Sequence, residues 1–347
     1  MSRYLDNIRE DFKEYFSILS KDIPDWLYDY IETKELLKQQ YISTTCGIIY
    51  TDLFSAKELN IFYSSLDHSI AVALIVWNFT HDKTQTLAGL FHDIATPCFK
   101  HCVDFLNGDY MNQESTEDLT KEIIENSKEI MSLLNKDNIK IEDVCNYHIY
   151  PICDNETPKL SADRLEYTLS NALFVHKTLS IEEVKEIYND LEIQTNEEGI
   201  IEIGFKTKKI ARNLVKLTSK LSIIYRDERT RYSMQFIADL IKRLVQDELI
   251  TINDLYNKKE SEIIKIIEES KYKEIFEIWK NSKKIKISKE EPKDVYFVHH
   301  PSKVRYIDPL FNGLRMSKAC KIANKMIEKN LSYDMSNYIY LDFEFVD

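Results

Sequence analysis

The segment SLDHSIAVALIVWNF, residues 65–79, is apolar nearly all round when it is drawn as a helix. A helix without a polar face is typical of the centre of a domain, where other elements surround it. Most of the chain to about residue 285 also shows helical periodicity. We therefore expect a domain in which other helices pack around residues 65–79.

Two further segments carry apolar stripes at helical spacing. In TQTLAGLFHDIA the stripe follows i, i+3, i+4, i+7 and consists of Leu87, Leu90, Phe91 and Ile94. His92 and Asp93 point away from that stripe. In SADRLEYTLSNALFV the stripe consists of Leu165, Leu169, Ala172 and Leu173. The opposite, polar face carries Asp163, Glu166, Tyr167, Ser170 and Asn171.

The predicted strand content is small. LEIQ and IIEIGF flank the turn residues NEEG and indicate a short β-excursion at 191–206. After a charged stretch at 280–293, Val, Tyr, Phe and Ile runs indicate strands around one helix near 317–329, with a terminal strand in NYIYLDFEFV. We therefore predict an all-α fold, a helical bundle with a small α+β C-terminal appendage. Its parts are an N-terminal helical segment (1–44), a helical core with its extension (45–285) and the appendage (290–347).

The composition restricts the ligands that the chain can bind. Lys and Arg number 46 against 58 Asp and Glu, a net charge of −12. Nonspecific nucleic-acid binding depends on neutralising phosphates, so a nucleic-acid partner is not expected. A small anionic substrate remains compatible, because a metal ion and a few local cations can offset the overall field. The six glycines form no GxGxxG or Walker-type loop, so phosphate chemistry would need a metal ion.

The chain shows no sign of export or of membrane insertion. Its start, MSRYLDNIREDFKEYF, lacks an apolar signal region, and no window reaches 18 consecutive apolar residues. The six cysteines are dispersed without a CxxC pair, which fits a reducing compartment. Cys98 and Cys102 are expected to be buried small apolar side chains rather than metal ligands. We expect a cytoplasmic protein with no membrane partner, for which a homo-oligomer is compatible.

Four residues could converge on one metal ion: His68, His92, Asp93 and Asp163. Imidazole nitrogen combined with carboxylate oxygen suits Mn, Fe, Ni, Zn or Mg and leaves positions open for water and a phosphate oxygen. Lone histidines on helices are more often structural, so the pattern by itself indicates a metal site only weakly.

Three blocks of the sequence resemble the HD-domain phosphohydrolases, in the order H…HD…D: LDHSIAVALIVWNF, LAGLFHDIATPCFKHCVDF and LSADRLEYTLSNAL. The branch they are most similar to is that of the deoxynucleoside-triphosphate triphosphohydrolases. The resemblance covers roughly 45–250 and extends weakly to EEGIIEIGFKTKKIARNLVKL and KVRYIDPLF. It implies an HD-domain helical bundle and a divalent metal ion held by His68, His92, Asp93 and Asp163.

The chain departs from that branch at three positions. Thr96 stands where the branch has a catalytic His after the HD pair, and Gln113 replaces the His of a His-Glu pair. Ser65 replaces an Arg three residues before the first metal His. These groups would hold a triphosphate or protonate its leaving group. We therefore expect activity on dNTPs to be weak or absent, or directed to a substrate whose leaving group needs less protonation.

Other residues match the branch and are candidates for catalysis or substrate binding. His101 and Asp104 lie i,i+3 and could orient water or shuttle a proton, with a buried structural hydrogen bond as the alternative. Arg164 could bind phosphate, with a surface ion pair as the alternative. Tyr167 resembles a sugar- or base-contacting tyrosine, and Glu114 stands at the Glu of the His-Glu pair. The resemblance assigns Tyr167 and Glu114 to substrate binding.

Two further groups are interpreted as structural. His148 could line the pocket, but a structural role is favoured. The cluster Arg226, Arg229 and Arg231 could bind an effector or a nucleic acid, but a solvated helix face is favoured.

The predicted activity is metal-assisted hydrolysis of a phosphoester in a nucleotide-like substrate, with His101 and Asp104 positioning water or relaying a proton. The enzymatic alternatives are a monophosphatase and a cyclic-nucleotide phosphodiesterase, and the net charge disfavours a nuclease. The alternative from another class is a catalytically weak or inactive HD-domain protein that senses nucleotides or binds a partner.

Overall fold

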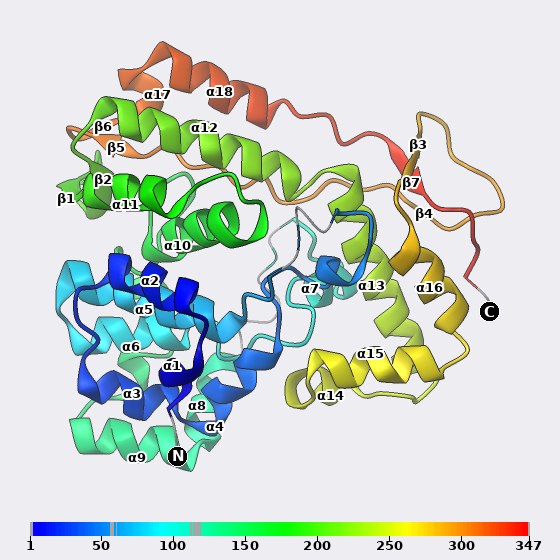
Figure 1. Ribbon diagram of the computed structural model, residues 1–347, viewed down its shortest axis with the longest axis horizontal. Helices are drawn as coiled ribbons and strands as arrows, with labels where there is room; N and C mark the ends of the chain where they lie inside the picture. Colours follow the sequence, from blue (N-terminus) through cyan, green and yellow to red (C-terminus); the bar gives the residue numbers. More distant parts are fainter. Residues whose placement is uncertain (1–2, 56–58, 60, 112, 114–118, 346–347) are drawn as a thin grey trace.

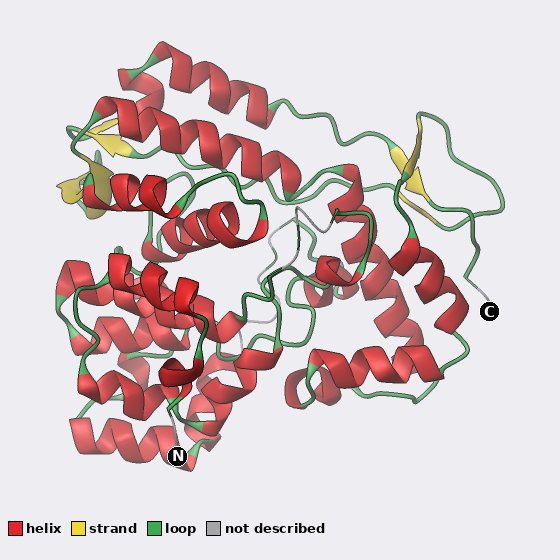
Figure 2. Ribbon diagram, viewed as in Figure 1, coloured by secondary structure: helices red, strands yellow, loops and turns green. Residues whose placement is uncertain are grey.

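Helices dominate the protein, and strands occur in two small sheets (Figures 1 and 2). The computed structural model describes residues 3–55, 59, 61–111, 113 and 119–345. The chain is 56% helical and 7% strand. Within the described ranges, every helix is too short or too polar to cross a membrane.

The elements follow one another in this order. The helices before the first strand are α1 (Tyr4–Asn7), α2 (Glu10–Leu19), α3 (Asp25–Ile31), α4 (Lys34–Lys38), α5 (Ser65–Thr80), α6 (Lys83–Phe91), α7 (Cys102–Leu106), α8 (Thr120–Asn126), α9 (Lys128–Asp137), α10 (Ala162–Ser170) and α11 (Ile181–Asn189). The later helices are α12 (Lys208–Ile224), α13 (Glu228–Gln246), α14 (Ile252–Asn257), α15 (Glu260–Glu269), α16 (Lys273–Asn281), α17 (Met316–Ala319) and α18 (Lys321–Leu331). The strands are β1 (Leu191–Thr195), β2 (Ile201–Phe205), β3 (Lys286–Ser288), β4 (Phe297–Val298), β5 (Leu310–Phe311), β6 (Leu314–Arg315) and β7 (Tyr338–Tyr340).

The predicted central helix is confirmed as α5. All residues from Ser65 to Val76 are buried, and α5 packs against α2, α6 and α10. A capping box fixes its start: the Ser64 hydroxyl accepts the N–H of Asp67, and the Asp67 carboxylate accepts the N–H of Ser64, each at 3.1 Å. Because these bonds satisfy amide groups at the helix end, the first turn holds His68 in a defined direction.

Gly89 sets the distance between α5 and α6. A Cβ atom there would lie 3.3 Å from Val76 Cγ2 and 3.4 Å from Val72 Cγ1, at the lower limit of ordinary contact. The missing side chain therefore allows α6 to lie close against α5. A short turn joins the two helices, so the end of α6, where His92 stands, lies beside the start of α5.

Two buried arginines fasten the C-terminal region to the start of α13. Arg226 and Arg231 are 0% exposed, so the predicted solvated helix face is wrong for these two. Arg231 NH1 donates to the carbonyls of His300 at 2.8 Å and Met335 at 3.0 Å. Arg226 donates to the carbonyl and the side chain of Asn330. Two separate stretches of the C-terminal region are thus held to the turn before α13 and to its first turn.

The predicted all-α class is wrong, because the protein is a helical bundle with a small sheet content. The strand orders are β1-β2-β5-β6 and β3-β7-β4. β1 and β2 form the hairpin predicted at 191–206, and β2 also pairs in parallel with β5 through Gly204 and Leu310. The sequence pattern indicated the hairpin but not this distant partner. A lone hairpin leaves edge amide and carbonyl groups unpaired, and β5 satisfies part of them.

The C-terminal region packs on the helical part of the molecule. The helix predicted around 317–329 is present as α17 and α18, and β7 lies within the predicted terminal strand. α18 packs along α12 (Figure 1). The part boundaries at 44, 285 and 290 stay predictions. Cys98 and Cys102 are fully buried, as expected.

Glu260 anchors a strained loop that follows α6. Phe99 and Lys100 have φ angles of 66° and 46°, a left-handed conformation that is uncommon for residues with a side chain. The Glu260 carboxylate accepts the N–H of Phe99 at 3.0 Å. It also accepts the N–H of Ser43 at 3.2 Å and the hydroxyl of Tyr50 at 3.0 Å. These bonds hold the loop in its unusual path.

Glu260 should make the stability of the fold depend on pH. Burial raises its pKa to about 7, from an ordinary value of 4.5, although its hydrogen bonds from Phe99 and Tyr50 act in the opposite direction. Folding therefore favours the protonated acid. This stabilisation is fully present below about pH 4.5 and is lost as the pH rises through about 7.

The test compares the wild type with Glu260→Gln by urea unfolding between pH 4.5 and 8. We expect the free energy of unfolding of the wild type, relative to the variant, to fall over this range by up to about 3 kcal/mol. Glu269→Gln, an exposed position on the same helix, is the matched control. A difference between wild type and Glu260→Gln that does not change with pH would contradict the prediction.

Candidate metal centre

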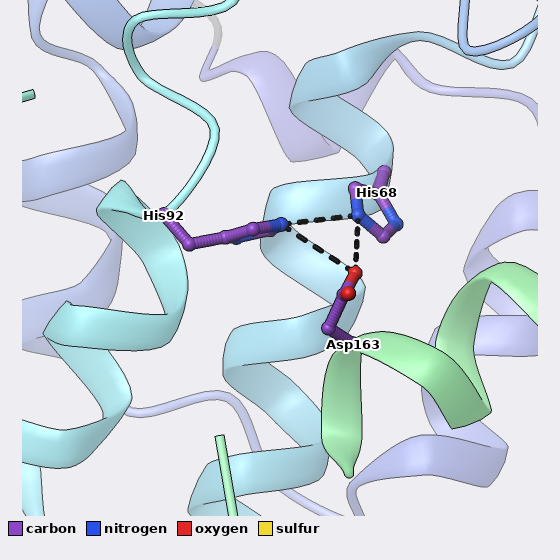
Figure 3. A group of neighbouring side chains, drawn as sticks. All are labelled: His68, His92 and Asp163. Atoms are coloured by element: carbon purple, nitrogen blue, oxygen red, sulfur yellow. Dashed lines mark hydrogen bonds and ion pairs between the residues drawn. The ribbon is translucent and has the colours of Figure 1, made fainter. Parts of the chain in front are cut away.

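Three of the predicted metal ligands meet in the interior (Figure 3). His68 comes from the first turn of α5, His92 from the end of α6 and Asp163 from the first turn of α10. His68 Nε2 lies 3.1 Å from both His92 Nε2 and Asp163 Oδ1, and His92 Nε2 lies 3.7 Å from Asp163 Oδ1. The two shorter separations match neighbouring ligands of one ion, which stand roughly 3.0–3.4 Å apart at bond lengths of about 2.1 Å.

The other ring nitrogens show how the two imidazoles are oriented. His92 Nδ1 lies 2.7 Å from the carbonyl oxygen of Gly89, and His68 Nδ1 is hydrogen-bonded to the carboxylate of Glu166. A carbonyl and a carboxylate only accept, so each Nδ1 carries the hydrogen and each Nε2 of a neutral ring carries a lone pair. Three acceptor atoms therefore face one another, and this cluster could hold a metal ion.

The pKa values express the same preference for a positive charge. Burial alone would lower the pKa of His68, but the carboxylates of Glu166 and Asp163 raise it to about 10. Burial favours the protonated form of Asp163, but the hydrogen bond and charge of His68 hold its pKa below the usual range. The carboxylates therefore stabilise a positive charge at this cluster, as on a protonated His68, and a bound metal ion would be stabilised in the same way.

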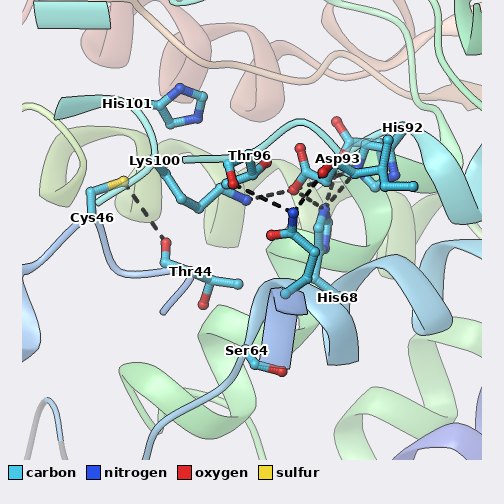
Figure 4. A network of polar contacts seen from close by, with 12 residues as sticks. Thr44, Cys46, Ser64, His68, His92, Asp93, Thr96, Lys100 and His101 are labelled. Atoms are coloured by element: carbon cyan, nitrogen blue, oxygen red, sulfur yellow. Dashed lines mark hydrogen bonds and ion pairs between the residues drawn. The ribbon is translucent and has the colours of Figure 1, made fainter. Parts of the chain in front are cut away.

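Asp93, the fourth predicted ligand, lies at the margin of the cluster. Its Oδ2 is 3.8 Å from Nε2 of both His68 and His92. The same oxygen lies 2.5 Å from Lys100 Nζ, and Figure 4 shows Lys100 reaching toward it from the left-handed loop. Burial would lower the pKa of Lys100, but Asp93 raises it, so the ammonium is charged. Asp93 thus lies between the three clustered ligands and the ammonium group of Lys100, with which it forms an ion pair.

Glu166 supports the cluster from behind, a role that the sequence analysis did not assign. Its side chain is 0% exposed, and besides His68 its carboxylate accepts the hydroxyls of Tyr63 at 2.7 Å and Tyr15 at 3.3 Å. The signal was present in the sequence, because Glu166 lies on the polar face of its helix with Asp163.

The cluster opens into a cavity of about 220 Å³. Its walls include cationic side chains as well as apolar and aromatic ones. The cations are Lys100, Arg164, Lys303 and Arg305, and the apolar and aromatic residues include Val175, Ile224, Tyr225 and Met234. The three candidate metal ligands, cationic side chains and an apolar wall therefore meet in one cavity.

The two residues predicted to be catalytic are in contact beside this cavity. His101 Nδ1 lies 2.9 Å from Asp104 Oδ2, and Asp104 is fully buried. Burial lowers the pKa of His101, although Asp104 acts in the opposite direction. The ring is therefore neutral near neutral pH, with Nδ1–H donating to Asp104 and a lone pair on Nε2.

Two of the three predicted substrate-binding residues line the cavity, Arg164 and Tyr167, whereas Glu114 lies outside the described residues. Arg164 NH1 donates to Asn155 Oδ1 at 2.6 Å and lies 3.4 Å from Asp154 Oδ1. Its guanidinium is thus engaged in a largely buried ion pair on the cavity wall, not in the surface ion pair of the alternative interpretation.

Cations lie near Thr96 and Gln113, two of the positions where the triphosphohydrolases that the chain resembles have a histidine. Lys100 follows Thr96 in the same loop, and Gln113 Oε1 accepts a hydrogen bond from Arg305 NH2 at 2.7 Å. Neither Lys100 nor Arg305 was predicted. Arg305 is distant in sequence, and only the folded chain brings it to this place. Ser65 stays buried in α5.

His148, for which a structural role was favoured, lines the cavity as well. Its Nδ1 lies 2.9 Å from Asp154 Oδ2, and Asp154 is buried. A second His–Asp pair therefore stands on the cavity wall, besides His101 and Asp104.

Known proteins resemble the chain in sequence and in fold, but no protein-family model matches it. It is 24% identical over 265 residues to the uncharacterized protein YdhJ of Bacillus subtilis, covering 75% of this chain and 78% of YdhJ. It is 25% identical over 263 residues to the uncharacterized protein MG461 of Mycoplasma genitalium, covering 67% of this chain and 60% of MG461.

Two solved structures share the fold. A hypothetical protein from Aquifex aeolicus superposes with a TM-score of 0.63 at 16% identity, over 92% of this chain and 93% of that one. The phosphohydrolase BT4208 from Bacteroides thetaiotaomicron superposes with a TM-score of 0.57 at 12% identity, over 92% of this chain and 96% of that one. At such identities the likeness establishes the fold alone.

Glu166→Gln should weaken metal binding while leaving the ligands in place. The amide oxygen can still accept the hydrogen of His68 Nδ1. The negative charge of Glu166, which makes Nε2 of His68 a stronger ligand for a metal ion, is lost. We expect the affinity for Mn²⁺ or Zn²⁺ to fall by about 10- to 100-fold. Isothermal titration calorimetry measures it, with Glu186→Gln, exposed on α11, as the matched control. Equal affinities in wild type and Glu166→Gln would show that Glu166 does not tune the cluster.

Proposed function

We propose that the protein is a divalent-metal-dependent phosphohydrolase that acts on a phosphoester of a nucleotide-like substrate. The observation that carries the proposal is the convergence of acceptor atoms from His68, His92 and Asp163 beside a cavity lined by cations. Imidazole and carboxylate donors suit Mn, Fe, Ni, Zn or Mg, and lysine and arginine suit a phosphate. The fold shared with the phosphohydrolase BT4208 supports the reaction class by analogy.

His68, His92 and Asp163 would hold the ion, with Asp93 available as a further ligand once Lys100 releases it. When bound, a divalent ion polarises a phosphate oxygen and lowers the pKa of a nucleophilic water.

Proton transfer falls to the histidines of the cavity. The neutral His101 would accept a proton from the attacking water at Nε2, and the buried Asp104 carboxylate would stabilise the imidazolium that forms. Thr96 cannot protonate a leaving group near neutral pH. His148, oriented by Asp154, is another cavity histidine, and it would be the acid if alkyl esters were cleaved as fast as nitrophenyl esters.

The second candidate is a nucleotide-sensing or partner-binding protein that keeps the metal site without turnover. The ion pair between Lys100 and Asp93 favours it, because an ammonium on that carboxylate competes with a metal ion. The threonine at position 96 favours it as well, since it removes a proton donor from the loop after the HD pair.

The experiment that separates the two candidates is a panel of nucleoside mono-, di- and triphosphates with Mn, Mg, Ni, Co and Fe. Release of inorganic phosphate, pyrophosphate and triphosphate is measured for each combination. Turnover supports the enzyme, and the product identifies the bond that is cleaved. Metal and nucleotide binding without any product would support the sensor.

Asp104→Asn and His92→Ala should affect an active enzyme differently. Asp104 contacts His101 rather than the metal cluster, so Asp104→Asn should lower kcat by about 10²- to 10⁴-fold while metal content stays unchanged. His92→Ala should remove metal and activity together. Metal content is measured by atomic emission on the purified proteins. Loss of metal from Asp104→Asn would contradict these assignments.

The hydrolysis rate should depend more on the leaving group of the substrate than on its nucleobase. With Thr96 at the family's histidine position, esters of nitrophenol should be cleaved faster than alkyl phosphate esters, by at least about tenfold. Hydrolysis rates of the two ester classes at saturating Mn²⁺ measure this ratio. Fast release of triphosphate from several dNTPs would refute the prediction and would point to another histidine as the acid.

A further inference from the structure

Arg305 reaches the cavity from a part of the chain remote from the metal cluster. It lies in the irregular segment between β4 and β5, which runs across the middle of the molecule (Figure 1). Bonds before and after Arg305 fix this segment: Lys303 N–H donates to the carbonyl of Tyr110 at 3.2 Å, and Asp308 N–H to that of Pro158 at 2.9 Å. The position of Arg305 is therefore built into the fold.

Among the described residues, the partners of the Arg305 guanidinium are neutral. Its NH2 donates to Gln113 Oε1 at 2.7 Å and lies 3.4 Å from His101 Nε2. The face of the Tyr167 ring lies next to it, with its centroid 5.9 Å from the guanidinium carbon. Among the residues that the structure describes, no carboxylate forms an ion pair with Arg305.

Arg164, the other arginine of the cavity, is paired with an acid, unlike Arg305. Arg164 lies 3.4 Å from a carboxylate oxygen of Asp154 and also donates to Asn155. Lys100, another cavity cation, is paired with Asp93. Arg305 is thus a cavity cation whose charge is not balanced by a described acid. A half-buried guanidinium in this state favours an anionic ligand.

We propose that Arg305 forms an anion subsite beside the metal centre, which takes a phosphate group of a phosphate ester or pyrophosphate. The planar guanidinium matches two phosphate oxygens, and Gln113 is a neutral partner that can be exchanged for them. The Tyr167 ring stands beside the guanidinium. In the context of the proposed function, on which this assignment of the ligand rests, the subsite receives the phosphate that is not bound to the metal ion.

The probe is inorganic pyrophosphate, titrated calorimetrically into the full chain with Mn²⁺ and, separately, in EDTA. We expect Arg305→Gln to weaken binding by at least about tenfold under both conditions, the loss that follows from removing a charged hydrogen bond. Arg305→Lys should lose less, because it keeps the charge without the planar fork. Arg212→Gln, on α12 outside the cavity, is the matched control and should bind as the wild type does.

Gln113→Glu provides a variant that keeps Arg305 itself. A carboxylate in place of the amide would neutralise the guanidinium and should weaken pyrophosphate binding as strongly as Arg305→Gln, whereas Gln113→Ala should not. Circular dichroism establishes that each variant is folded. Should Arg305→Gln fail to fold, the difference in pyrophosphate affinity between Gln113→Glu and Gln113→Ala decides whether the charge of Arg305 binds the anion.

The outcomes separate this inference from the proposed function. If the wild type hydrolyses no phosphoester but loses pyrophosphate binding in Arg305→Gln, the subsite stands and the proposed enzyme fails. If the wild type turns over and Arg305→Gln and Gln113→Glu keep its KM and its affinity for pyrophosphate, the subsite is overturned and the enzyme stands. Absence of pyrophosphate binding to the wild type at millimolar concentration also overturns the subsite.

Discussion

The geometry of the metal centre depends on one buried carboxylate, that of Glu166. A negative charge removed from water is tolerated only when donors surround it, and here the donors come from separate elements: His68 from α5, Tyr15 from α2, and Tyr63 from the stretch before α5. The same carboxylate keeps the hydrogen of His68 on Nδ1 and so leaves the lone pair of Nε2 facing the cavity. The Glu166 carboxylate therefore both joins three elements and prepares His68 Nε2 to bind a metal ion.

Glu260 is a second buried carboxylate that holds separate parts of the chain together, with a different consequence. It accepts backbone amides of two loops, at Ser43 and Phe99, and thereby supports the left-handed residues that direct Lys100 toward Asp93. Glu260 forms no ion pair with the described residues and burial raises its pKa, whereas Asp163 faces a histidine and its pKa is lowered. Two buried acids of the same protein thus differ in ionisation because their partners differ in charge.

Periodicity predicted the local features of this protein, whereas the meeting of the distant residues His68, His92 and Asp163 was expected mainly from the resemblance to a family. The central helix, the hairpin at 191–206 and the polar face that carries Asp163 all follow from periodicity, which depends on neighbouring residues only. The pairing of β2 with β5 and the arrival of Arg305 beside Gln113 join residues more than 100 positions apart. No periodicity reports such contacts. The buried Arg226 and Arg231 were misinterpreted for the same reason, since their carbonyl partners lie in the C-terminal region.

The distribution of charge connects the acidic composition with a phosphate ligand. A net charge of −12 repels a long polyanion from most of the surface, because each added phosphate meets the overall field. A small phosphate ester is affected mainly by the groups within a few ångströms, and in the cavity these include Lys100, Lys303 and Arg305. Two of these three cations come from the C-terminal region, so the fold brings positive charge to a cavity that the acids Asp93, Asp154 and Asp163 also line. The fold can therefore favour small anions over large ones by bringing together cations that lie far apart in the sequence.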